Sequence, residues 1–349
     1  MLKLVFFFFT LLSALSHCFV LDSLTALNNQ YPVGKNSRIY LVSAGTAEQM
    51  LEVQLITMNS KEIRNGTILT TPTAIGSLNP FIPSEDNDQL IVTVPVNLTG
   101  WLYITEETDL NVYAMSQNSS TINFQPGTNF FFNLYFPAFG TIPIAKNVVI
   151  SNSVSLRGYV GVPEENGVKF FDSASISDLT TYDSLQLAMQ IFHFKSNGVD
   201  VKYEINYGVR EGFSTQSSGL LMTRAFPIQY SRLTQVYDVD NRYNDNITLY
   251  MVTRFDNTKL YYITIRLSYS DKTPDQVFQM NSTSDTVIQS ISPFATIKID
   301  PQGPFAIQYR LQNENPKPTT LAYQTTTQAG NRWGILFLIA VVLTRLREA

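Results

Sequence analysis

Two stretches of the chain follow one plan: residues 121–136, TINFQPGTNFFFNLYF, and residues 296–311, TIKIDPQGPFAIQYRL. In an ungapped alignment they share Thr121, Ile122, Pro126 and Phe130 with Thr296, Ile297, Pro301 and Phe305, and apolar residues pair at Phe124/Ile299 and Phe132/Ile307. Alternating apolar residues on both sides of a turn with Pro and Gly are typical of two β-strands joined by a short connection. The similarity indicates one β-rich module that the chain uses twice.

Short strand-like runs, separated by Gly, Pro, Asn and Asp, recur along the chain. They cover residues 38–42, 51–58, 90–96, 101–105, 110–115, 130–136, 147–151, 186–194, 199–207, 248–254, 260–269, 295–300 and 305–311. Long helical periodicity is missing outside the termini. These patterns predict an all-β protein with two tandem antiparallel β-sandwich domains of the jelly-roll type, residues 19–178 and residues 179–312.

Two polar segments, residues 106–109 and residues 256–258, separate neighbouring strand-like runs. Asp and Asn favour tight turns because their side chains hydrogen-bond to the nearby backbone. Both segments are therefore expected to be hairpin turns, which join antiparallel neighbours within one sheet.

The first 18 residues predict a secretory signal peptide. Lys3 supplies the positive start and residues 4–12 the apolar centre, and small residues favour cleavage after Cys18 or after Ser16. A buried helix or a membrane anchor is the alternative, but the apolar run is too short to span a bilayer. Cys18 is the only cysteine, so cleavage after it leaves each domain to depend on its apolar core without disulfides.

Five Asn-x-Ser/Thr sequences predict N-linked glycosylation on surface loops or edges, at Asn65, Asn97, Asn118, Asn246 and Asn281. Charged residues make up 15% of the chain, and the formal net charge is −4. Lys and Arg form no cluster in the sequence before the last residues. A surface that binds nucleic acid or anionic lipid is therefore not expected on the extracellular part.

The C-terminal end divides into a Pro- and Thr-rich stalk, residues 313–331, and a hydrophobic tail, residues 332–349. Three interpretations of the tail stay open: a GPI attachment signal, a short membrane span, or an end that docks on the core. The 12 apolar or near-apolar residues 333–344 suit a GPI signal in length. As a helix they would be about 18 Å long, which is short for about 30 Å of hydrocarbon. The first two interpretations place the protein on the extracellular face of the plasma membrane, and the third leaves it secreted.

The runs at residues 102–105, 109–113, 121–124 and 130–135, followed by Pro137, Phe139 and Pro143, resemble the closing strands of CUB-like domains. The resemblance is to the divergent CUB-like domains of secreted and GPI-anchored nematode proteins, since ordinary CUB domains contain cysteines. It implies a two-domain surface protein of a family linked to infection and stress responses, without known enzymatic activity. It carries over no functional residue.

Residues that commonly perform catalysis are scarce. His193, the one histidine besides His17, lies in an apolar run, which predicts a packed strand residue rather than a catalytic base. The carboxylate pairs Glu106/Glu107 and Glu164/Glu165 are adjacent, so in a strand their side chains point to opposite faces. No catalytic, cofactor-binding or metal-binding residue is predicted, and the protein is not expected to be an enzyme.

Two groups of acidic residues offer oxygen ligands: Asp238, Asp240 and Asp245, and Asp86 with Asp88. Calcium takes six or more oxygen ligands, and neither group has the spacing of an EF-hand loop. Asp- and Asn-rich turns account for both groups, and calcium binding at Asp238, Asp240 and Asp245 stays an open alternative.

The signal peptide, glycosylation sites, stalk and tail together predict a non-enzymatic cell-surface glycoprotein that recognises an extracellular protein or glycan, in adhesion or defence. A secreted carbohydrate-binding protein or glycoside hydrolase is the alternative. Trp101, Tyr103, Tyr237 and Tyr243 would then stack on sugar, although aromatic residues in alternating strands usually belong to the core.

Overall fold

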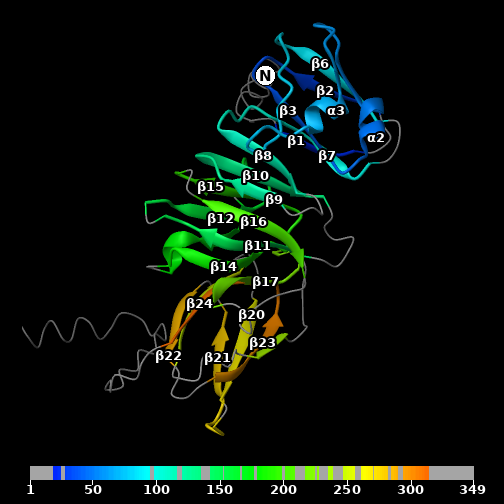
Figure 1. The fold of residues 1–349 in the computed structure, drawn as a ribbon. Coiled ribbons are helices and arrows are strands. Elements are labelled where there is room, and N and C mark those ends of the chain that lie inside the picture. Colours follow the sequence, from blue (N-terminus) through cyan, green and yellow to red (C-terminus); the bar gives the residue numbers. More distant parts are fainter. Residues whose placement is uncertain are drawn as a thin grey trace, which may run out of the picture. The chain divides into compact units, whose positions relative to one another are not determined.

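The computed structural model describes residues between 19 and 313. The described ranges are 19–24, 28–94, 98–115, 120–134, 142–151, 153–165, 167–176, 179–198, 201–208, 217–224, 226–227, 235–238, 247–255, 261–269, 271–281, 284–289 and 294–313. The predicted signal peptide, the stalk beyond residue 313 and the hydrophobic tail lie outside them. Within these ranges the all-β prediction is confirmed, because the strands form several mostly antiparallel sheets with few short helices (Figure 1).

Two antiparallel sheets form the N-terminal part. Sheet I has the order β2 (Asn28–Val33), β6 (Asp88–Thr93), β4 (Gln54–Thr57), β5 (Ile63–Asn65), and sheet II the order β1 (Val20–Ser23), β7 (Gly100–Thr105), β3 (Arg38–Ser43). Leu55 and Val92 of sheet I share one apolar core with Leu41 and Leu102 of sheet II. The two sheets therefore pack against one another across this core.

Two short helices belong to this N-terminal part. Thr46 caps α2 (Ala47–Glu52) in a capping box with Gln49, and Asn65 caps α3 (Gly66–Thr70). Both caps satisfy backbone N–H groups that have no partner within the helix. Leu51 and Glu52 thus belong to a helix, which corrects the strand predicted at residues 51–58; only Gln54–Thr57 form β4.

Three further sheets follow. Sheet III has the order β13 (Lys169–Asp172), β12 (Leu156–Val160), β15 (Ile191–Ser196), β10 (Gly127–Asn133), β8 (Leu110–Met115). Sheet IV has the order β22 (Ser284–Gln289), β19 (Ile247–Arg254), β24 (Ala306–Asn313), β17 (Ser218–Met222), β14 (Thr181–Gln186), β11 (Ile142–Val149), β16 (Lys202–Gly208), β9 (Ser120–Asn123). Sheet V has the order β18 (Gln235–Asp238), β23 (Phe294–Gln302), β20 (Tyr262–Tyr269), β21 (Gln276–Met280). Pairing is antiparallel except between β8 and β10 and between β14 and β17.

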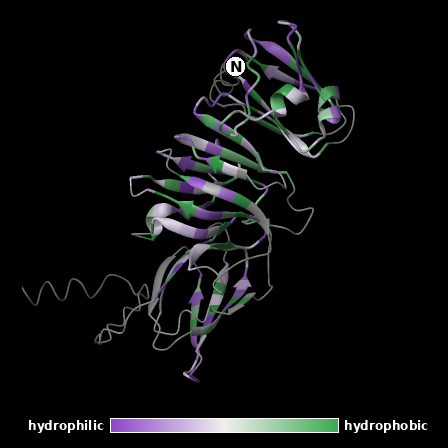
Figure 2. Ribbon diagram, in the orientation of Figure 1, coloured by the Kyte–Doolittle hydropathy of each residue, from purple (hydrophilic) through white to green (hydrophobic). Residues whose placement is uncertain are grey.

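Apolar cores connect the successive sheets, and apolar residues recur along their strands (Figure 2). Tyr103 of sheet II packs in one core with Phe130 and Phe132 of sheet III. Phe131, on the opposite face of β10, joins the core between sheets III and IV. Another core contains Leu249 and Ile307 of sheet IV and residues of β20 and β23 of sheet V.

Sheet IV contributes to a core on each of its faces. On β17, Leu220 and Met222 belong to the core shared with sheet III, whereas Leu221 belongs to the core shared with sheet V. Successive residues of a strand point to opposite faces, so this division follows directly from the alternation. Sheet IV therefore contributes to two separate apolar cores, one on each face.

Each of the two similar segments contains a strand, a short connection and a second strand, but the connection lies at residues 124–126 in the first and at residues 303–305 in the second, which are not aligned positions. Residues 121–136 run from β9 in sheet IV to β10 in sheet III, and residues 296–311 run from β23 in sheet V to β24 in sheet IV. The aligned apolar residues are buried in both segments: Phe124, Phe130 and Phe132, and Ile299, Phe305 and Ile307. Upstream of these segments, β7 and β21 lie at corresponding positions in the same ungapped alignment. There the arrangement differs, because β7 and β9 lie in sheets II and IV while β21 and β23 both lie in sheet V.

Three local predictions are wrong. The segment at residues 106–109 joins β7 of sheet II to β8 of sheet III, so it is not a hairpin turn. Strands β19 and β20, which flank residues 256–258, likewise belong to different sheets. The single strand expected at residues 186–194 is interrupted, since β14 ends at Gln186 and β15 begins at Ile191.

Sheets III and IV each combine strands from both sides of residue 179, the predicted domain boundary.

Candidate ligand-binding face

Sheet III carries a group of charged side chains on the face opposite its core with sheet IV. Along β12, Leu156 points into that core, so Arg157 and Tyr159 point the other way. Along β15, Phe192 and Phe194 occupy the core, which leaves His193 and Lys195 on the same face as Arg157. We call Arg157, Tyr159, Lys169, Asp172 and Lys195 the basic face.

The strand register arranges these residues in two adjacent rows. Arg157 lies directly opposite Asp172 on one neighbouring strand and opposite Lys195 on the other. In the next row, Tyr159 lies opposite Lys169 and His193. Neighbouring strands are about 4.8 Å apart, so three cationic side chains meet on a rigid surface.

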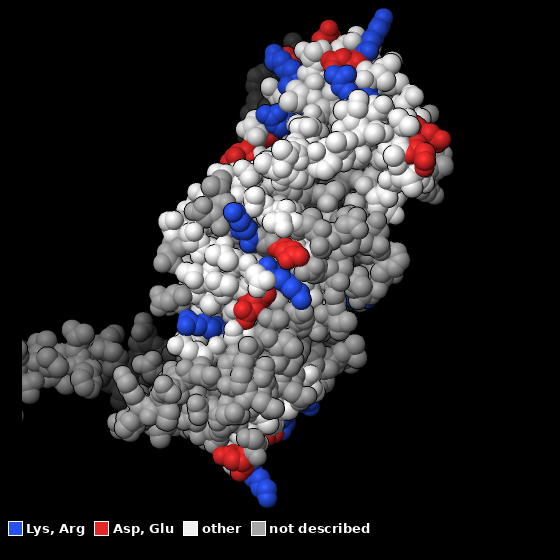
Figure 3. Space-filling view, viewed as in Figure 1, with Lys and Arg blue, Asp and Glu red and all other residues white. Residues whose placement is uncertain are grey.

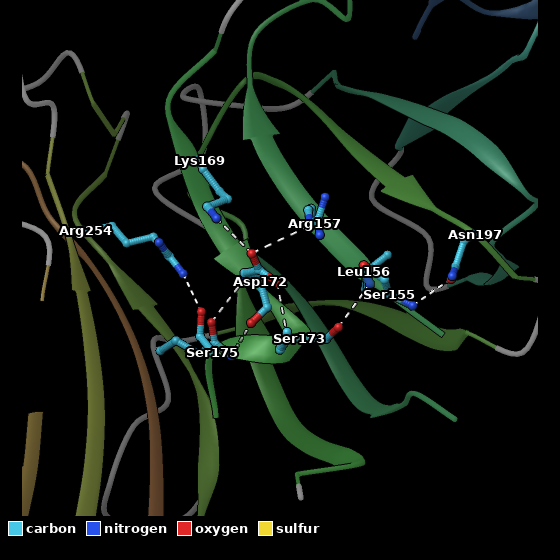
Figure 4. A network of polar contacts seen from close by, with 11 residues as sticks. Ser155, Leu156, Arg157, Lys169, Asp172, Ser173, Ser175, Asn197 and Arg254 are labelled. Atoms are coloured by element: carbon cyan, nitrogen blue, oxygen red, sulfur yellow. Dashed lines mark hydrogen bonds and ion pairs between the residues drawn. The ribbon is translucent and has the colours of Figure 1, made fainter. Parts of the chain in front are cut away.

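Asp172 holds two of the cations in place (Figure 4). Its Oδ2 lies 2.8 Å from Lys169 Nζ and 3.7 Å from Arg157 Nε, and its Oδ1 accepts a hydrogen bond from Ala174 N at 3.2 Å. The Asp172 side chain is only 11% exposed, whereas those of Arg157 and Lys169 are 54% and 37% exposed. Lys195 is exposed as well. With three cations and one carboxylate, the basic face has the opposite sign to the net charge of the chain.

The side of the molecule that Figure 3 shows is mixed in charge, because Lys and Arg alternate with Asp and Glu rather than filling one large area. The basic face itself covers two rows of residues on three strands. Its size therefore suits a small acidic group better than a long polyanion.

Tyr159 and His193 form the apolar support of the basic face. Their rings stack with centroids 5.3 Å apart and planes at 16°, and Lys195 Nζ lies 5.7 Å from the centroid of the Tyr159 ring. Burial is the main cause that lowers the pKa of His193 to about 4. The hydrogen bond to Gly161 opposes this shift, whereas the charge of Lys195 lowers the pKa further. The imidazole is thus neutral at pH 7, and because the Gly161 carbonyl only accepts, Nδ1 donates across the 3.0 Å contact. The prediction of a packed strand histidine is confirmed.

A second polar group joins sheet II to the loop after β12. Tyr103 Oη and Thr105 Oγ1 donate hydrogen bonds to Glu164 Oε1 at 2.6 Å and 2.5 Å. Burial, followed by the bond to Glu164, raises the pKa of Tyr103 far above its usual range. Tyr103 is completely buried, so it cannot stack on a sugar as the carbohydrate alternative required.

Of the other aromatic residues proposed to stack on sugar, only the side chain of Trp101 is described. Trp101 is partly buried and packs against Phe132, with ring centroids 5.6 Å apart. The side chains of Tyr237 and Tyr243 lie outside the described residues.

Asp88 is a structural carboxylate. It is buried and accepts hydrogen bonds from Asn59 N at 2.7 Å, Ser60 N at 3.0 Å, Ser60 Oγ at 2.8 Å and Gln89 N at 2.7 Å. Desolvation raises the pKa of Asp88, but these bonds outweigh it and hold the pKa well below its usual range. Asp86 instead pairs with Lys35 at 2.6 Å. The two carboxylates therefore have different partners within the protein. They do not form one group of oxygen ligands.

The remaining candidate residues lie partly outside the described ranges. The side chains of Asp238, Asp240 and Asp245 are not described, and among the residues that are, no group of three or more His, Cys, Asp or Glu could hold a metal ion. Asn97, Asn118 and Asn246 are likewise not described. Asn65 is partly exposed at the end of β5, and Asn281 is exposed directly after β21.

Sequence reasoning missed the basic face because its cations lie on three strands. Arg157, Lys169 and Lys195 are separated along the chain, and only the register brings them together. The available signal was the alternation of a cation with buried apolar residues in residues 156–160 and 191–196.

The chain matches no protein-family model, and a search of curated proteins finds no similar sequence. In the part of the chain that the structure describes, none of the helices has the length and apolar character needed to cross a bilayer.

Proposed function

We propose that this chain is a non-enzymatic extracellular recognition protein that binds an acidic carbohydrate through the basic face of sheet III. The observation that carries the proposal is the cross-strand pair Arg157 and Lys195. Like charges directly opposite one another destabilise an antiparallel pair. Asp172 offsets only part of this charge, because one carboxylate lies against both Arg157 and Lys169. An anionic group bound between Arg157 and Lys195 would relieve the remaining repulsion.

The chemistry of the side chains favours a sulfate or carboxylate on a sugar. The Arg157 guanidinium presents several donors in a plane that matches such groups, and Lys195 supplies a second positive charge. Tyr159 offers apolar ring surface beside them, which suits the C–H groups of a sugar ring. Because the three side chains project from paired strands, the backbone needs no ordering when a ligand binds, and the entropy cost is confined to the side-chain rotamers.

The location follows from the predicted signal peptide, residues 1–18, and the five glycosylation sites. The stalk and the tail, residues 313–331 and 332–349, would hold the protein on the outer face of the plasma membrane by a GPI anchor or a short span. The CUB-like interpretation, with two tandem jelly-roll domains, belongs to the same proposal. The sequence similarity of residues 121–136 and 296–311 favours it, although sheets III and IV each combine strands from both sides of residue 179. A role in adhesion or defence agrees with this location.

Binding of a heparin-derived oligosaccharide to the full-length protein, compared with the same oligosaccharide after desulfation, tests the ligand. We expect the sulfated form to bind and Arg157→Ser to weaken binding roughly ten- to a hundredfold, because a hydrogen bond to a charged group contributes about 1.5–3 kcal/mol. Lys202→Ser is the matched control, since Lys202 is an exposed strand residue of sheet IV. Equal binding by wild type and Arg157→Ser would refute the assignment.

Phosphatidylinositol-specific phospholipase C tests the membrane attachment. The protein is expressed in animal cells with a tag placed after residue 18. Release from intact cells by the enzyme would establish a GPI anchor, whereas retention would indicate a short span. Protein found only in the medium would contradict membrane attachment.

A further inference from the structure

We infer that an N-linked glycan on Asn65 covers the exposed isoleucines on either side of it in the chain: Ile63, with the row of isoleucines on the outward face of sheet I, and Ile68 in helix α3. The inference rests on the proposed extracellular location, because N-glycans are added during secretion. It assigns a structural role to this one glycan.

These isoleucines lie where exposed apolar side chains are concentrated. Ile63 is 60% exposed and Ile68 is 59% exposed. The strand register places Ile63 opposite Ile56 of β4, and Ile56 opposite Ile91 of β6. The alternate residues Leu55 and Val92 point into the core with sheet II, so this row of isoleucines lies on the outward face. Ile56 and Ile91 are partly exposed.

Asn65 stands between the two most exposed isoleucines. Ile63 and Asn65 are two positions apart on β5, so their side chains leave the same face of the sheet. The Asn65 Oδ1 accepts a hydrogen bond from Ile68 N at 3.1 Å, as the cap of α3. This bond fixes the side-chain amide beside Ile68, with Nδ2, the atom that carries a glycan, on the other side of the amide group.

Glycosylation leaves the helix cap intact. Attachment forms a bond between Asn65 Nδ2 and C1 of the first N-acetylglucosamine, breaks the bond from C1 to the diphosphate of a lipid-linked oligosaccharide donor, and releases the lipid diphosphate and one amide proton. Oδ1 takes no part and can still accept from Ile68 N. The C–H face of the sugar then packs over Ile63 and Ile68, which removes apolar surface from water.

The position on β5 adds a second effect. β5 is an edge strand of sheet I, and exposed edges with apolar side chains invite pairing with another chain. A glycan at Asn65 therefore hinders association between copies of this protein as well as covering the isoleucines.

The test compares full-length wild type with Asn65→Asp, both expressed in animal cells. Asp retains the capping oxygen, so the variant removes the glycan without removing the cap. We expect Asn65→Asp to bind more of a fluorescent dye specific for apolar surface, to self-associate at lower concentration in light scattering, and to melt roughly 2–4 °C lower. Asn281→Asp is the matched control, because it removes a glycan from a site whose neighbour two positions earlier is Gln279.

The triple variant Asn65→Asp, Ile63→Thr and Ile68→Gln separates covering from other effects of the glycan. Without the isoleucines it should return to the dye binding and self-association of wild type. Unchanged dye binding in Asn65→Asp, with Asn65 shown by glycopeptide mass spectrometry to be occupied in wild type, would overturn the inference. An empty Asn65 beside an occupied Asn281 would also overturn it while supporting secretion, whereas five empty sites would refute the extracellular location itself.

Discussion

Gln308 of β24 and Asp172 of β13 exchange two hydrogen bonds although 136 residues separate them. Asp172 N donates to Gln308 Oε1 at 3.3 Å, and Gln308 Nε2 donates to Asp172 O at 3.0 Å. Gln308 Nε2 also donates to Tyr182 Oη at 2.8 Å. The buried amide of Gln308, in sheet IV, thus hydrogen-bonds to both the N–H and the C=O of Asp172, in sheet III. The side-chain carboxylate of the same Asp172 contacts Arg157 and Lys169 of the basic face.

Replacing Gln308 should therefore destabilise the protein. Gln308→Leu leaves the N–H and C=O of Asp172 without their partner, and we expect a loss of about 2–4 kcal/mol, since each buried unsatisfied group costs about 1–3 kcal/mol. Chemical denaturation measures the change in the free energy of unfolding. Gln312→Leu, at an exposed position of the same strand, should change it little, and equal effects of the two variants would contradict the role of Gln308.

His193 should make stability depend on pH. Its pKa falls to about 4 in the folded protein, against about 6.5 in an unfolded chain. Between these values the unfolded state binds more protons, so stability is lost as the pH falls from about 6.5 to about 4, by on the order of 3 kcal/mol. The measurement is the free energy of unfolding over this range for wild type and His193→Gln, which keeps a donor toward Gly161. Parallel pH profiles for the two proteins would show that His193 does not contribute.

Asp88 should make stability depend on pH in a more acidic range than His193 does. Its folded pKa lies below its usual range, so the stability it provides is present above about pH 4 and is lost as the pH falls through the folded pKa. Asp88→Asn should consequently be less stable than wild type at pH 7, with a difference that shrinks in acid. Hydrogen exchange at the amides of Asn59 and Ser60 should be faster in the variant, whereas Asp86→Asn should leave it unchanged because Asp86 accepts from neither amide.

Phe131 should be among the most costly positions to truncate. Its ring stacks on Tyr113 and Phe192, with centroids 4.9 Å and 5.3 Å away, in the core between sheets III and IV. We expect Phe131→Ala to cost about 3–5 kcal/mol through lost burial and an unfilled cavity. Val149→Ala, at a largely exposed position of β11, is the control in the same denaturation experiment, and a loss below about 1 kcal/mol for Phe131→Ala would contradict the packing.

Alternation along the strands made the all-β fold predictable, and it also identified core residues such as Phe130 and Ile307. The assignment of strands to sheets was not predictable, because a polar turn can either reverse the chain within a sheet or carry it to the next one. The turn at residues 106–109 takes the second course. Helix α2 had a readable signal, since Thr46 and Gln49 form a capping box over three residues. No sequence signal marked the residues of the basic face as one group, because β12, β13 and β15 come together only through long-range strand pairing.

Strand β24 has a consequence for how the chain is made. It lies between β17 and β19 in sheet IV, and it supplies Ala306 to one core and Ile307, Tyr309 and Leu311 to the other. During synthesis, a ribosome must release residues 306–313 before either core can close. Both cores therefore stay incomplete until residues 306–313 have been translated, and pairing over long sequence distances is slow. A folding chaperone that shields strand faces is therefore expected to be needed for this protein until its last strand arrives.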